Sequence, residues 1–130
     1  QMLYPDLTVT LRAGMLIREE GARFAVHGTR GSYVKFGLDP QEGLLRSGHA
    51  TPNRGPWAAE SETEWGILNS DEGRRKYPTV QGNYLSYYDA IYDTLCNGAQ
   101  PPVSHEDIVT DLRILEAAFE SNKTGQTITL

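Results

Sequence analysis

The chain has 130 residues, of which twelve are basic and seventeen acidic, and a formal net charge of -5. A chain of this length is expected to form one domain, residues 1–130, around one core. Its negative charge disfavours nucleic acid and anionic membrane surfaces as partners, because both repel an acidic protein.

No apolar run approaches the roughly 20 residues of a membrane helix, and the first residues lack the pattern of a secretion signal. The single cysteine, Cys96, excludes an internal disulfide and any site built from several cysteines, and we expect it to be structural. These features predict a soluble, cytoplasmic protein. Strand-like alternation begins soon after Gln1, which indicates a truncated sequence.

Strands are predicted in the first third of the chain. Leu7 to Arg12 alternates apolar and polar residues, and a second apolar stretch, Met15 to Ile17, follows Gly14. Arg23 to His27 and Ser32 to Phe36 predict a hairpin, because small residues between them suit a tight turn.

The middle of the chain predicts a short helix, a long loop and two short strands. Asp39 is a capping residue before Pro40, and the helix is expected to run to about Ser47. The loop spans residues 49–64. Strands are expected over 65–69 and 74–80, around a turn at Asp71-Glu72-Gly73.

Two amphipathic helices and a last strand are predicted next. Asn83 caps the first helix, which ends at Asn97-Gly98. Ser104 and Asp107 suit the first turn of the second helix, and residues 127–130 suit a strand. This order of elements predicts an α+β fold with an open, mostly antiparallel β-sheet and helices packed on one face.

Motifs for cofactors and metals are missing from the sequence. It has no G-x-G-x-x-G, no phosphate-binding loop and no G-x-S-x-G elbow, and Gly28-Thr29-Arg30-Gly31 is better explained as a hairpin turn. A metal site would require tertiary contacts to bring distant side chains together. The histidines are His27, His49 and His105. Glu60, Glu62 and Glu64 are interpreted as a solvated acidic loop rather than a cation site.

The segment Arg18-Glu19-Glu20-Gly21-Ala22-Arg23 crowds four charges between two predicted strands. Its arginines and carboxylates could hold a hydroxyl-rich or anionic substrate, but the residues by themselves favour a polar hairpin connection. The first amphipathic helix carries four tyrosines, more than core packing needs, and the surplus suggests a partner surface. They are Tyr84, Tyr87, Tyr88 and Tyr92.

The run from Arg23 to Glu42, RFAVHGTRGSYVKFGLDPQE, resembles part of the C-terminal domain of the glucose-fructose oxidoreductase/inositol dehydrogenase/MocA family. The tyrosine-rich helix, the Pro101-Pro102-Val103 link and the helix containing Arg113 to Ala118 are similar to the end of that domain. The resemblance implies a dihydrodipicolinate-reductase-like C-terminal domain of an NAD(P)-dependent sugar or polyol dehydrogenase.

The same resemblance implies that two domains have different roles in the protein. NAD or NADP would bind to an N-terminal Rossmann domain that this chain lacks, and no cofactor or catalytic residue is expected in the chain itself. The chain would supply part of the substrate site, with Arg18, Glu20 and Arg23 near the substrate, and the interface of a homodimer or higher oligomer. The alternative is a free-standing interaction module without enzymatic activity.

Overall fold

The computed structural model describes residues 1–48 and 58–130, which group into two compact units. The first unit comprises Gln1–Glu42 and Ala59–Gln81. The second comprises the described parts of Gly43–Ala58 and of Gly82–Leu130. No helix in the described part of the chain is both long and apolar enough to cross a lipid bilayer.

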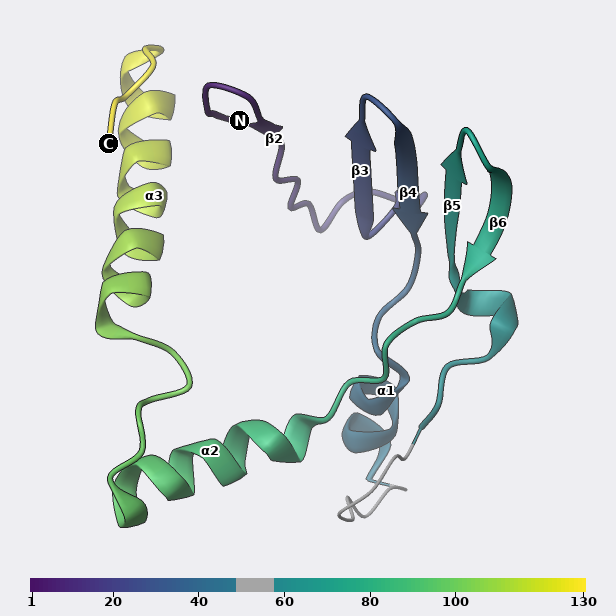
Figure 1. Ribbon diagram of the computed structural model, residues 1–130. Coiled ribbons are helices and arrows are strands. Elements are labelled where there is room, and N and C mark those ends of the chain that lie inside the picture. The colour runs from purple at the N-terminus through teal and green to yellow at the C-terminus, as the bar shows by residue number, and fades with distance from the viewer. Residues whose placement is uncertain (49–57) are drawn as a thin grey trace. The chain divides into compact units, whose positions relative to one another are not determined.

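A four-stranded antiparallel sheet forms most of the first unit (Figure 1). The strands are β3 (Phe24–Gly28), β4 (Gly31–Lys35), β5 (Gly66–Ser70) and β6 (Gly73–Tyr77), and they pair in sequence order. The predicted antiparallel α+β fold is therefore confirmed. The strand predicted over 74–80 ends at Tyr77, three residues early, because Pro78 has no backbone N–H to donate to the sheet.

The residues in both hairpin turns of the sheet are of types that favour tight turns. Thr29 and Arg30 join β3 to β4, and Gly28 pairs directly with Gly31, as expected for a two-residue hairpin. Asp71 and Glu72 join β5 to β6, where Gly73 has φ of 108°, a conformation that L residues rarely adopt. The hairpin predicted around Gly28–Gly31 is confirmed.

The strand register assigns every sheet residue to one of two faces, because directly opposed residues share a face. Phe24 is opposite Lys35, Val26 is opposite Tyr33, and Leu68 is opposite both Tyr33 and Arg75. The apolar face carries Phe24, Val26, Tyr33, Lys35, Leu68, Arg75 and Tyr77. The polar face carries Ala25, His27, Ser32, Val34, Ile67, Asn69, Arg74 and Lys76.

Three predicted strands are wrong or shortened. Of Leu7–Arg12, only β2 (Thr8–Val9) is a strand, and it pairs with β1 (Met2–Leu3) over two residues. Residues 15–17 and 127–130 have no strand structure. A strand requires a hydrogen-bonding partner, and sequence alternation supplies only one side of that pair.

The two short helices each begin directly after a capping residue. Helix α1 (Pro40–Ser47) starts after Asp39, whose Oδ1 accepts a hydrogen bond from the backbone N–H of Gln41 at 2.8 Å. The 3-10 helix η1 (Glu62–Glu64) follows Ser61, whose backbone N–H donates to Oε2 of Glu64 at 3.3 Å. The cap at Asp39 and the helix after it are confirmed.

Two longer helices, α2 (Tyr84–Asn97) and α3 (His105–Thr124), belong to the second unit. Oδ1 of Asn83 accepts from the N–H of Leu85 at 3.1 Å, and Oγ of Ser104 accepts from the N–H of Asp107 at 3.1 Å. Both helices end at a glycine with positive φ, Gly98 and Gly125. The predicted caps are thus confirmed.

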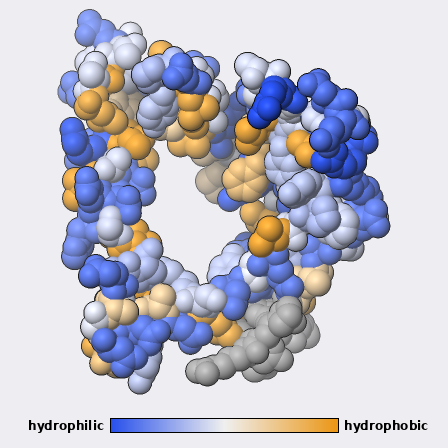
Figure 2. Space-filling model, viewed as in Figure 1, coloured by the Kyte–Doolittle hydropathy of each residue, from blue (hydrophilic) through white to orange (hydrophobic). Residues whose placement is uncertain are grey.

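Apolar side chains remain largely exposed across the described residues. None of them is buried, and Figure 2 shows apolar residues, in orange, reaching the surface in many places. Met15 is 101% exposed, Leu68 is half-buried, and Phe119 on α3 is 75% exposed. The described residues of the two units therefore contain no fully buried apolar side chain.

Candidate functional site

A groove of about 610 Å³ lies on the apolar face of the sheet and along the segment that follows β6. Its lining is mostly apolar and aromatic: Phe24, Tyr33, Lys35, Leu68, Tyr77, Pro78, Thr79 and Val80. The Tyr33 ring lies across Gly66, so that a Cβ atom at Gly66 would overlap it. A glycine is therefore needed beneath this ring.

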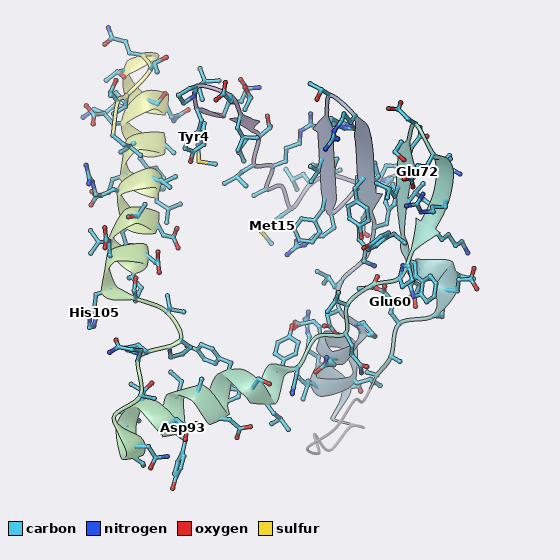
Figure 3. The ribbon with its side chains drawn as sticks, in the orientation of Figure 1. Tyr4, Met15, Glu60, Glu72, Asp93 and His105 are labelled. Atoms are coloured by element: carbon cyan, nitrogen blue, oxygen red, sulfur yellow. The ribbon has the colours of Figure 1, made fainter. Side chains whose placement is uncertain are left out.

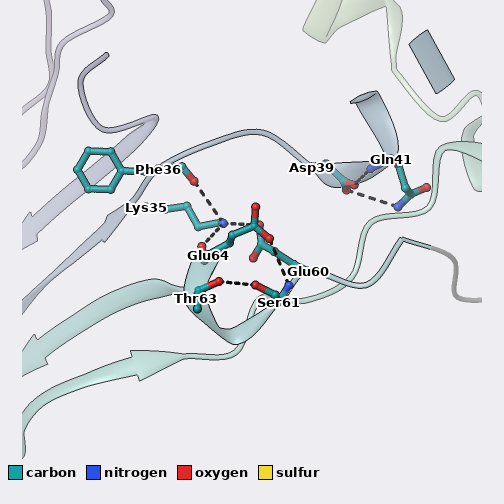
Figure 4. A network of polar contacts seen from close by, with 8 residues as sticks. All are labelled: Lys35, Phe36, Asp39, Gln41, Glu60, Ser61, Thr63 and Glu64. Carbon is teal, nitrogen blue, oxygen red and sulfur yellow. Dashed lines mark hydrogen bonds and ion pairs between the residues drawn. The ribbon is translucent and has the colours of Figure 1, made fainter. Parts of the chain in front are cut away.

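Lys35 anchors one end of the groove through a buried ion pair (Figure 4). Its Nζ lies 2.5 Å from Oε1 of Glu60, 2.9 Å from the carbonyl oxygen of Glu64 and 3.4 Å from that of Phe36. These contacts use all three N–H groups of the ammonium. The two side chains are only 11% and 8% exposed, so the pair is shielded from water.

The ion pair ties the end of β4 to the segment that leads into β5. Glu60 precedes η1, and Lys35 also binds the backbone of that helix at Glu64. Oε2 of Glu60 and Oγ1 of Thr79 are buried and have no hydrogen-bond partner among the described residues. The predicted solvated acidic loop is therefore wrong for Glu60, because the tertiary fold brings it to a buried cation.

The residues predicted to lie near a substrate are all exposed. Arg18 and Glu20 occupy a segment without helix or strand, and neither forms an ion pair with another described residue. Arg23 stands immediately before β3, with Cζ 5.9 Å from the centroid of the Phe24 ring. Arg23 is thus close to a residue that lines the groove, whereas nothing fixes Arg18 or Glu20 there.

The histidines do not assemble a metal site in the described part of the chain, where no group of three potential ligands occurs. Nδ1 of His27 is 2.9 Å from Oγ of Ser32 on the neighbouring strand. His105 is the first residue of α3, and His49 lies outside the described residues. Cys96 is a free, exposed cysteine, and its structural role stays a prediction.

The four tyrosines of α2 do not pack into a core within the described residues. Their exposed fractions are 39% or more, and the rings of Tyr87 and Tyr88 meet edge to face at 5.6 Å. Figure 3 shows side chains projecting along both long helices, near the labelled Asp93 and His105. An exposed aromatic set of this kind is compatible with a partner surface.

Lys35 was not predicted as a site residue, although its position in the strand pattern could have indicated it. Lys35 alternates with Tyr33, so the strand pattern places its ammonium on the apolar face. A lysine on that face needs a carboxylate or carbonyl partner. Its partner Glu60 is 25 residues away in sequence and could not be identified from spacing alone.

The residues present do not fit a dinucleotide. The one glycine pair with related spacing, Gly28 and Gly31, closes an antiparallel hairpin instead of leading from a strand into a helix. A pyrophosphate site of the Rossmann type needs the N-terminus of that helix. The Gly28–Gly31 turn therefore lacks the helix that would hold a pyrophosphate.

Residues 2–130 match the family model described as "Oxidoreductase family, C-terminal alpha/beta domain". The chain is 37% identical to scyllo-inositol 2-dehydrogenase (NADP(+)) IolW of Bacillus subtilis, over 98% of this chain and 36% of IolW. It is 39% identical to the uncharacterized oxidoreductase YdgJ of Escherichia coli, over 98% of this chain and 37% of YdgJ.

A solved structure shares the same arrangement. The structure titled "putative oxidoreductase yvaA" of Bacillus subtilis superposes with a TM-score of 0.80 and 36% identity, over 90% of this chain and 36% of that chain. The chain thus spans little more than a third of the relatives that it matches.

Proposed function

Because the chain belongs to the glucose-fructose oxidoreductase, inositol dehydrogenase and MocA family of oxidoreductases, we propose that it is the C-terminal domain of an NAD(P)-dependent sugar or polyol dehydrogenase. The observation that carries the proposal is the match to the family's C-terminal domain over residues 2–130. The similarity to IolW, named for an inositol substrate and NADP, supports a polyol substrate and a nicotinamide cofactor.

The proposal divides the work between two domains. A preceding Rossmann domain binds NAD or NADP and supplies the catalytic residues, and this chain is one domain, residues 1–130, that is inactive alone. Two observations support this division: the chain spans about a third of its relatives, and its glycine pair forms a hairpin. The single cysteine, which forms no internal disulfide, favours a cytoplasmic location.

Within that protein, we assign the chain one wall of the substrate site. Arg18 and Arg23 would donate hydrogen bonds to substrate hydroxyls, and Glu20 would accept them, since these groups suit a hydroxyl-rich ligand. The exposure of all three and the nearness of Arg23 to the groove support this assignment. The substitution Glu20→Gln in the longer protein should raise KM for the polyol more than it lowers kcat.

The same proposal includes an interface. The apolar face of the sheet would associate with another subunit in a homodimer or higher oligomer, because large apolar surfaces rarely stay solvated in soluble proteins. Phe24 and Val26 on that face are 59% and 62% exposed.

The proposal is tested by comparing two polypeptides. The 130-residue chain and a longer protein that includes it are titrated with NADH and NADPH, followed by nicotinamide fluorescence, and assayed for oxidation of inositols and sugars. We expect saturable binding and turnover only for the longer protein. Saturable binding by the 130-residue chain, or a longer protein that binds neither nucleotide, would overturn the proposal.

A second candidate is an interaction module without enzymatic activity. The exposed apolar stripe of α3, with Ile108, Leu112 and Phe119 each at least 45% exposed, favours it. The same titration separates the two candidates, because an interaction module predicts no nucleotide binding in either polypeptide.

A further inference from the structure

The polar face of the four-stranded sheet carries a row of polar side chains that crosses every strand. His27 on β3 is opposite Ser32, Ser32 is opposite Asn69, and Asn69 is opposite Arg74 on β6. Directly opposed residues on one face have Cβ atoms about 5 Å apart. These four residues, the polar row, therefore stand beside one another at the end of the sheet that holds both hairpin turns.

The polar row is rich in hydrogen-bond donors that the solvent can reach. Asn69 has an amide NH₂ group, and the guanidinium of Arg74 presents its N–H groups in a planar fork. Both side chains are exposed, and neither makes a hydrogen bond or ion pair with another described residue. Oγ of Ser32 lies 2.9 Å from Nδ1 of His27, so the histidine holds the serine hydroxyl within the row.

The charge of this face is positive, although the chain as a whole is acidic. The four strands contain no aspartate or glutamate. The two cations of the apolar face are neutralised by ion pairs with Glu60 and Glu72. On the polar face, Arg74 and Lys76 form no ion pair with a described residue, and Asp71 lies outside the strands, in the turn before β6. Charge complementarity therefore favours an anion on this face.

An apolar strip lies beside the polar row on the same face. It consists of Ala25, Val34 and Ile67, which are directly opposed on three neighbouring strands. Lys76 stands at the end of the strip, opposite Ile67, and is the diagonal neighbour of Asn69. A ligand on this face thus meets hydrogen-bond donors along one side, carbon surface along the other and a second cation at the corner.

A phosphate monoester matches this arrangement better than a carboxylate does. The two oxygens of a carboxylate lie in one plane, and a single arginine fork binds both of them. The donors of the polar row come from three strands, and the face has two cations. A phosphate monoester has up to two negative charges at neutral pH and three oxygens that accept hydrogen bonds. Its organic part can cover the apolar strip.

We propose that Ser32, Asn69 and Arg74 bind the phosphate group of a small organic phosphate monoester. Arg74 donates two parallel hydrogen bonds to two phosphate oxygens, and the amide of Asn69 and the hydroxyl of Ser32 donate to the oxygens on their side. Lys76 supplies the second positive charge, and the organic part of the ester lies over Ile67 in the apolar strip.

This site is separate from the groove, because the two lie on opposite faces of the sheet. Ser32 and Asn69 each adjoin a residue that lines the groove, Tyr33 and Leu68, and successive residues of a strand face opposite sides. A phosphate monoester on the polar face therefore leaves the groove open to another ligand.

Titration of the 130-residue chain with phenyl phosphate and with inorganic phosphate tests the site, followed by NMR at constant ionic strength. We expect saturable shifts of the Asn69 and Arg74 side-chain signals, and tighter binding of phenyl phosphate. Arg74→Gln should weaken binding at least about tenfold, since a hydrogen bond to a charged group is lost. The matched control is Arg75→Gln, which removes the same charge at the next position but on the apolar face, and it should change the dissociation constant less than about twofold.

Shifts that do not saturate, or that sodium chloride reproduces at the same ionic strength, overturn the proposal. Equal weakening by Arg74→Gln and Arg75→Gln also overturns it, because binding would then follow net charge alone. Equal affinity for the two ligands assigns the site to free phosphate and overturns the contact of the organic part with Ile67. The spectra of both variants report whether they fold. No polyol or nicotinamide is present, so the outcome does not depend on the proposed function.

Discussion

The ammonium of Lys35 and the carboxylate of Glu60 meet at 2.5 Å, although 25 residues separate them in the sequence. The pair fastens the segment before β5 to the end of β4, and it closes one end of the groove. Because both side chains are buried, the contribution of each one to the free energy of unfolding depends on the presence of the other.

Replacement of Lys35 by methionine leaves Glu60 as a buried charge without a cation. We expect Lys35→Met to lower the free energy of unfolding by about 3–5 kcal/mol, whereas the double variant Lys35→Met/Glu60→Leu recovers most of the loss. Urea unfolding followed by circular dichroism measures both. The matched control is Arg75→Met, which removes an exposed ion pair with Glu72 and should cost no more than about 1 kcal/mol. Equal losses for Lys35→Met and Arg75→Met would contradict the buried character of the pair.

The contact between Gly66 and the Tyr33 ring predicts a second result. Gly66→Ala forces the ring away from the sheet and should destabilise the fold by about 1–3 kcal/mol. Gly21→Ala serves as its control, since a Cβ at Gly21 meets no atom within 4 Å and should be neutral or slightly stabilising. The truncation Tyr33→Ala should remove most of the penalty of Gly66→Ala when the two are combined. An unchanged unfolding midpoint for Gly66→Ala alone would show that the ring does not rest on the glycine.

Local chemistry explains which features could be predicted from the sequence. The caps at Asn83 and Ser104 and the hairpin around Gly28–Gly31 depend on residues within a few positions of each other. The Lys35 and Glu60 pair depends on a tertiary contact, so only the presence of a lysine on an apolar face could have signalled it. The alternation of Leu7–Arg12 predicted a strand, but whether it forms depends on a partner that the sequence does not specify.

The cap of α3 supports a third prediction. Oγ of Ser104 accepts from the N–H of Asp107 and donates to its carboxylate at 2.6 Å. Ser104→Ala should therefore cost about 1 kcal/mol of stability, and Ser104→Asp should retain most of the cap. Thermal unfolding at 222 nm measures the difference, with Ser86→Ala inside α2 as the control. A larger loss for Ser86→Ala than for Ser104→Ala would argue against the cap.

The two faces of the sheet predict how copies of the chain associate. In a two-fold symmetric interface, the same surface of two copies meets, so like charges on that surface repel each other. The polar face has Arg74 and Lys76, which would repel their counterparts in a second copy. The apolar face has one exposed cation, Arg75, and Glu72 already pairs with it at 2.8 Å. Association through the sheet should therefore use the apolar face.

Matched glutamates on the central strand β5 test this choice of face. Leu68→Glu places a carboxylate on the apolar face opposite Arg75, and Asn69→Glu places one on the polar face opposite Arg74. Both variants gain a cross-strand arginine, but Leu68 is half-buried in the groove and Asn69 is exposed, so circular dichroism must first show that both variants fold. Strand spacing and rise give the face of the sheet only about 300 Å², against about 800 Å² per partner in a stable interface, so the self-association is expected to be weak. In sedimentation velocity over a concentration series, the unsubstituted chain and Asn69→Glu should show a rising sedimentation coefficient, whereas Leu68→Glu should remain monomeric. Loss of association in Asn69→Glu alone would assign the interface to the polar face.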